Sequence, residues 1–119
     1  VVDAFSGDSV PVHLLTREAF EQYARHLKPN GVIAVHITNR FLDLQPVIQT
    51  AAQKLGFTAR LIDHPGDDDR LVYPSRWALL AKDPLWFEQN ALKAATTLES
   101  PTGFVPWTDD YSSLFAVVK

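Results

Sequence analysis

Short apolar runs alternate with helical periodicities along this chain, and this alternation constrains the fold more than any other feature. The clearest helix is expected over residues 44–55, where apolar side chains repeat at three- and four-residue spacing. Gly56 follows it as a C-terminal stop. Asp43 is the expected N-cap, and Pro46 falls in the first turn, where its missing N–H costs little.

A second helix is expected in the segment TREAFEQYARHL, with Thr16 as its cap and Phe20 on its apolar face. Gly31 follows, and we expect it to adopt a positive φ there. Unbroken apolar runs at residues 1–5 and 32–37 are typical of strands that are buried on both faces.

Three more apolar runs predict strands at residues 57–63, 76–82 and 114–119. A short helix is expected between the last two, with Asp83 as N-cap and Pro84 at its first position. The first half of the chain thus has the order strand, helix, strand, helix, strand, which indicates parallel strands joined by right-handed crossovers. The predicted fold class is α/β, the later half of a doubly wound sheet that is mostly parallel, with an antiparallel last strand inserted between its neighbours.

The composition is that of a single globular domain. The chain has 119 residues, is 46% hydrophobic and 21% charged, and lacks the ~20-residue apolar run of a membrane span. It contains no Cys, so we expect neither disulfides nor thiolate metal sites, and a cytoplasmic location is the default. Its net charge of −3 argues against a nucleic-acid partner. Because Met is absent even at position 1, the chain is either processed or a fragment of a longer protein, and we expect a fragment.

In parallel sheets, ligands bind beyond the carboxyl ends of the strands. This rule directs attention to the loop after residues 1–4 and to the TNR segment after residues 32–37. Asp3 and Asp8 lie in the first of these loops, where two carboxylates can bind a cation or accept a proton. The alternative, in which both residues only cap turns or helices, stays open because Asp is common in turns.

Three other segments have less specific patterns. Tyr73 can line a ligand slot or can pack half-buried beside the strand that follows. The HPGDDDR loop is predicted to be a solvated acidic turn and not a metal site, since consecutive Asp side chains rarely converge on one ion. The segment PWTDDY has an Asp pair beside two aromatic residues, and the alternative that it is a structural turn placing Trp107 and Tyr111 on the core stays open. No glycine-rich phosphate loop is present.

Three stretches resemble the spermidine synthase-like family of polyamine aminopropyltransferases. DAFSGDSVP followed by LLTREAF is similar to that family's strand-ending Asp, Ser-rich turn, second Asp and helix start. YPSRWALLAK resembles its Tyr-Pro-Ser-Gly segment, with Arg76 in place of the Gly, and WTDDYSSL resembles its Thr-Asp-Asp stretch. The resemblance implies one truncated catalytic domain over residues 1–119, the C-terminal half of a class I methyltransferase-like Rossmann sheet.

The resemblance also implies a reaction, in which an aminopropyl group moves from decarboxylated S-adenosylmethionine to a polyamine such as putrescine. Asp3 would hold the substrate ammonium and Asp8 would act as the base. Tyr73 and Asp109 would contact the substrate. The family's nucleotide-binding residues lie outside the matched half, so no cofactor-binding residue is assigned and the fragment itself is expected to be inactive and to bind no cofactor.

Two alternatives stay open. One keeps the fold and changes the reaction to methyl transfer from S-adenosylmethionine. The other is a non-catalytic interaction module, in which the bare edge of the first strand pairs with another chain, for example in a homodimer. Some members of the family that the chain resembles are fused to membrane transporter segments. We expect no membrane contact by residues 1–119 themselves.

Overall fold

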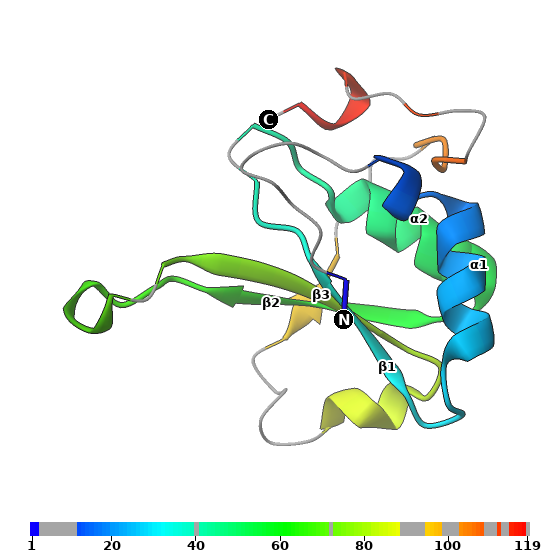
Figure 1. Cartoon of the computed structure of the whole chain (residues 1–119), viewed down its shortest axis with the longest axis horizontal. Helices are drawn as coiled ribbons and strands as arrows, with labels where there is room; N and C mark the ends of the chain where they lie inside the picture. Colours follow the sequence, from blue (N-terminus) through cyan, green and yellow to red (C-terminus); the bar gives the residue numbers. More distant parts are fainter. Residues whose placement is uncertain are drawn as a thin grey trace.

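The computed structural model describes residues 1–2, 12–39, 41–71, 73–88, 95–98, 103–108, 112 and 115–118. Their strands form one four-stranded sheet in the order β1-β3-β2-β4, and two α-helices pack beside it (Figure 1). The elements are η1 (Val12–Leu14), α1 (Arg17–His26), β1 (Val32–His36), α2 (Gln45–Leu55), β2 (Thr58–His64), η2 (Asp68–Arg70), β3 (Ser75–Ala81), η3 (Pro84–Glu88), β4 (Thr96–Thr97) and η5 (Phe115–Val117).

The predicted mostly parallel, class I methyltransferase-like Rossmann sheet is wrong for the described residues. β3 pairs antiparallel with both β1 and β2, and β4 pairs antiparallel with β2. The segment between β2 and β3 is too short for the dozen or more residues that a parallel crossover needs, so these two strands form a hairpin. β3 then occupies the place beside β1 that the sequence pattern gave to β2.

The end of the chain also differs from the prediction. Residues 114–119 were expected to form a strand, but Phe115–Val117 form the 3₁₀ turn η5. This turn lies against the loop after β1, where the Asp43 N–H donates to the Val117 carbonyl at 2.7 Å. Val118, the residue after this turn, forms an isolated antiparallel β-bridge with Leu42.

The first helix is confirmed, and its cap is the expected one. The Thr16 hydroxyl accepts a hydrogen bond from the Ala19 N–H at 3.2 Å, and Phe20 is completely buried in the core. The Tyr23 hydroxyl, one turn further along, donates to the Leu14 carbonyl at 2.8 Å. Burial raises the pKa of Tyr23 above its ordinary value.

Gly31 does not take the positive φ that was predicted for it. The helix instead ends at Leu27, whose N–H donates to the Ala24 carbonyl at 3.3 Å. A Cβ atom on Gly31 would lie 2.5 Å from Leu27 Cδ1. A larger residue at this position would therefore force the Leu27 side chain to shift, so glycine serves close approach here and not an unusual backbone conformation.

The second helix, α2, is confirmed as well. Pro46 lies in its first turn, and Gly56 ends it in the left-handed region with φ 75°. The N-cap position belongs to Leu44, one residue later than predicted. Asp43 still satisfies a helix donor, because its Oδ1 accepts from the Gln45 N–H at 3.1 Å.

β1 is not buried on both faces, as its apolar run had suggested. Ile33 and Val35 are buried in the core with residues of both α-helices, whereas the intervening side chains are only half-buried. On the less buried face the His36 ring stacks on Trp77 of β3, with centroids 4.8 Å apart. The alternation is that of a sheet covered by helices on one face.

β2 and β3 extend beyond the rest of the sheet as a hairpin arm, with η2 near its end (Figure 1). This arm accounts for the elongated shape of the molecule, which measures 44 × 33 × 27 Å. No helix in the described part of the chain has the length and apolar character that a membrane-spanning helix requires.

Candidate functional site

A small cavity with several polar lining residues lies at the end of β1, at the base of the hairpin arm, with a volume of ≈ 150 Å³. It includes Thr38 and Asn39 of the TNR segment, one of the two places where the sequence predicted a ligand. β3 and the end of β2 provide the opposite wall. The lining residues are Ile37, Thr38, Asn39, Asp63, Pro74, Ser75 and Arg76.

Thr38 connects the end of β1 to β3. The β1–β3 pairing continues to Ile37, whose N–H donates to the Arg76 carbonyl at 2.9 Å. The Arg76 N–H donates instead to Thr38 Oγ1, at 2.7 Å, and the same oxygen lies 2.8 Å from His36 Nε2. The side-chain hydroxyl thus takes the acceptor position that a main-chain carbonyl has in a regular ladder.

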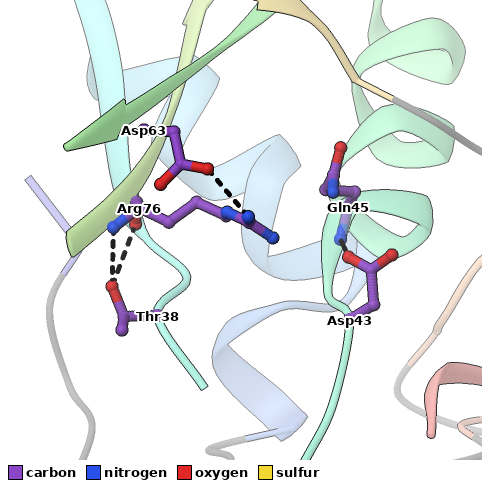
Figure 2. Close-up of polar contacts among 5 residues, drawn as sticks. All are labelled: Thr38, Asp43, Gln45, Asp63 and Arg76. Carbon is purple, nitrogen blue, oxygen red and sulfur yellow. Dashed lines mark hydrogen bonds and ion pairs between the residues drawn. The ribbon is translucent and has the colours of Figure 1, made fainter. Parts of the chain in front are cut away.

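Asp63 and Arg76, which both line the cavity, form an ion pair (Figure 2). Arg76 Nη2 donates to Asp63 Oδ2 at 2.8 Å, and the two residues are direct partners in the β2–β3 register. The Asp63 side chain is 54% exposed, and its Oδ1 has no hydrogen-bond partner among the described residues. Solvent therefore weakens this pair.

Asn39 shapes the other wall of the cavity. It is buried, and its Oδ1 accepts hydrogen bonds from the N–H groups of Phe41 and Leu42, both at 2.9 Å. Such a side-chain turn holds the loop in one conformation as it leaves the sheet. The loop then continues to Asp43, which binds the first turn of α2 (Figure 2).

The catalytic residues predicted from the sequence, Asp3 and Asp8, lie outside the described residues, as does Asp109. The residue before Asp3 is described. The Val2 N–H donates to the Ala34 carbonyl at 2.7 Å, and the Val2 carbonyl accepts from the His36 N–H at 2.9 Å. This bridge to β1 is parallel, so Val2 and β1 run toward the same edge of the sheet, the edge where the cavity opens.

Tyr73, the predicted lining residue, directly precedes Pro74 of the cavity wall but is not among the lining residues. It is 85% exposed and lies on the hairpin arm. Its contact with a substrate stays a prediction. Trp107 is buried in the core, in agreement with the structural interpretation of the PWTDDY segment.

The acidic loop forms an exposed turn. Asp67 Oδ1 accepts from the Asp69 N–H at 3.1 Å, and Oδ2 of the same carboxylate lies 3.5 Å from Arg70 Nε. Nowhere in the described part of the chain do three or more His, Asp or Glu side chains gather as metal ligands do.

Sequence reasoning missed Asp63 and Arg76 as site residues and treated them as parts of two strands. Asp63 directly precedes the HPGDDDR segment, and Arg76 lies near the start of the next predicted strand. An antiparallel hairpin brings such positions together, so the pair could have been found once a hairpin was assumed. No family model, curated protein or solved structure matches the chain.

Proposed function

We propose that this chain belongs to a spermidine synthase-like aminopropyltransferase of the cytoplasm and that the cavity at the end of β1 receives one ammonium end of the amine substrate. The motifs containing Asp3, Asp8 and Tyr73 suggest the reaction. The observation that carries the proposal is the carboxylate of Asp63, which lines a cavity at the end of β1 and whose Oδ1 bonds to none of the residues that the structure describes.

The size of the cavity fits this role. At ≈ 150 Å³ it is smaller than the ~300–1,000 Å³ pockets that enclose drug-sized ligands. It has room for the end of a narrow alkylamine but not for a nucleoside. Asp63 Oδ1 offers an oxygen acceptor to an ammonium group, which has three donors.

The proposed reaction explains why a second acidic group is needed. An alkylamine resembles Lys, with a pKa of about 10.4, so making it neutral at pH 7 costs about 4.6 kcal/mol. The neutral nitrogen attacks the carbon next to the sulfonium, the C–S bond breaks, and its electron pair goes to sulfur. The proton released by the attacking nitrogen passes to a carboxylate, for which Asp8 is the proposed base and Asp3 the ammonium ligand.

Arg76 moderates the affinity for an amine. Its guanidinium holds one oxygen of Asp63 at 2.8 Å and adds a positive charge beside the proposed ammonium position. We therefore expect millimolar binding of putrescine to this chain.

Amide NMR spectroscopy of the 119-residue chain tests the binding step. Titration with putrescine is expected to shift the amide resonances of Thr38, Asn39 and Arg76. Asp63→Asn removes the charge and should weaken binding severalfold. The matched control is Asp68→Asn, which removes an exposed Asp on η2, outside the cavity.

Equal binding by the Asp63→Asn variant and the unchanged chain would reject the amine site. Shifts confined to residues outside the cavity would reject it as well.

One observation favours a second candidate, methyl transfer from S-adenosylmethionine. Arg76 replaces the Gly of the related family segment, and its remaining N–H donors suit an acceptor that contains a carboxylate. Asp8→Asn in the full-length protein distinguishes the two reactions. Aminopropyl transfer should be abolished, whereas a methyltransferase that needs no base at this position should retain its activity.

A further inference from the structure

The lining of the cavity at the end of β1 has one negative and one positive side chain, those of Asp63 and Arg76. Its other lining residues are uncharged, so the lining has no net charge. A dication such as putrescine is attracted by the acidic half of this pair and repelled by the basic half. A plain diamine therefore uses only half of what the cavity offers to a ligand.

Both partners of the pair have bonding capacity beyond their mutual contact. Figure 2 shows the two side chains beside one another, joined through Arg76 Nη2 and Asp63 Oδ2 at 2.8 Å. Asp63 Oδ1 and the remaining guanidinium N–H groups bond to none of the residues that the structure describes. A guanidinium has five N–H donors in a fixed fork that fits a carboxylate, and a carboxylate oxygen accepts from an ammonium group.

A zwitterion complements a pair of this kind. In an α-amino acid the ammonium and the carboxylate are attached to the same carbon, so its two charges lie side by side, as those of Asp63 and Arg76 do. With the ammonium opposite Asp63 and the carboxylate opposite Arg76, both new contacts are attractive.

The size of the cavity agrees with such a ligand. Its volume is ≈ 150 Å³, and a cavity of about this volume holds a benzene ring. The ammonium, the α-carbon and the carboxylate of an amino acid are together no larger than that ring. The amino acid side chain would extend out of the cavity.

We infer that the cavity binds the α-amino acid end of the acceptor, and that the acceptor is a diamino acid whose side-chain amine reacts. This inference rests on the proposed function and names its substrate class. Asp63 holds the α-ammonium, and Arg76 holds the α-carboxylate. The bonds that form and break are those of the proposed reaction, with the side-chain nitrogen as the attacking atom and a carboxylate as the acceptor of its proton.

Two ligands that differ by one carboxylate test the inference on the unchanged chain. Ornithine has the two amines of putrescine and an α-carboxylate in addition. In amide NMR titrations of the 119-residue chain, ornithine should bind about fivefold more tightly than putrescine, with shifts at Thr38, Asn39 and Arg76. Salt at about 0.15 M screens the general attraction of a chain of net charge −3 for the dication.

A third ligand tests the ammonium contact. The ω-amino acid with the carbon chain of ornithine has the carboxylate and the distant amine but lacks the α-ammonium. It should bind severalfold more weakly than ornithine, because it leaves Asp63 without its partner.

Replacement of Arg76 by Gln should change the affinities for the two amines in opposite directions. Ornithine should bind severalfold more weakly because its carboxylate loses the guanidinium, whereas putrescine should bind more tightly because the repulsion is removed. The matched control is Arg70→Gln. Arg70 lies on η2, the turn that Leu71 ends with a left-handed φ of 56°, and outside the cavity. Circular dichroism checks that both variants fold.

The outcomes separate this inference from the proposed function. If putrescine shifts the cavity resonances and ornithine binds no more tightly, the diamino acid is rejected and the amine site stands. The same holds if Arg76→Gln weakens both ligands equally or if Arg70→Gln has the same effect as Arg76→Gln. If neither ligand shifts the cavity resonances, the inference and the proposed amine site both fail.

Discussion

Replacement of Thr38 by Val tests the claim that a side chain completes the β1–β3 ladder. The two side chains have nearly the same shape, but Val lacks the oxygen that accepts the Arg76 N–H at 2.7 Å and contacts His36 Nε2 at 2.8 Å. A buried donor left without a partner costs about 1–3 kcal/mol. Thr38 is half-buried, and His36 is open enough to bind water, so we expect a loss of about 1.5 kcal/mol in the free energy of unfolding.

Urea and thermal unfolding, followed by circular dichroism, measure this loss. For a chain of this length, about 1.5 kcal/mol corresponds to a decrease of about 4–9 °C in the unfolding midpoint. Thr38→Ser is the control, because it retains the hydroxyl and loses only a methyl group, worth about 0.8 kcal/mol. A Val variant at least as stable as the Ser variant would refute the ladder argument.

Three further substitutions probe the fold. Burial raises the pKa of Tyr23, so the stability gained from its neutral form is complete below the unfolded value of about 10 and is lost as pH rises through the folded pKa. Tyr23→Phe should remove this alkaline loss, which unfolding at a series of pH values checks, and should cost about 1 kcal/mol for the hydrogen bond to Leu14. Gly31→Ala places a Cβ against Leu27 and should cost about 1–3 kcal/mol in urea unfolding. Leu71→Gly should instead stabilise the fold by about 0.5–1 kcal/mol, because relief of ~1–2 kcal/mol of backbone strain exceeds the added chain entropy, and an unchanged or lower midpoint would contradict this.

Local elements could be predicted from the sequence because short-range rules decide them. The caps and apolar faces of α1 and α2 depend on residues within one or two turns, and Thr16 and Gly56 have the predicted roles. The strands β1, β2 and β3 were also predicted within two residues of their observed ends. Such patterns contain little information on which strands are neighbours.

Strand order and direction depend on competition between alternative strand pairings, which join residues far apart in the sequence. The alternation of strands and helices favoured a parallel pairing of β1 with β2, but it did not weigh the hairpin between β2 and β3. The residues of the candidate site divide in the same way, into those that a local pattern indicates and those that only strand pairing brings together. Thr38 and Asn39 were indicated by the end of a strand, whereas Asp63 and Arg76 become neighbours only through the antiparallel register.

The central position of β3 has a consequence for how the chain acquires its structure during synthesis. β1 and β2 are complete by His64, yet in the finished sheet neither pairs with the other, and both wait for β3, which ends at Ala81. Val32 must then find Ala81 across a long stretch of intervening chain. Non-local pairing of this kind slows folding, and it leaves two apolar strand edges open in the nascent polypeptide until the ribosome has released β3.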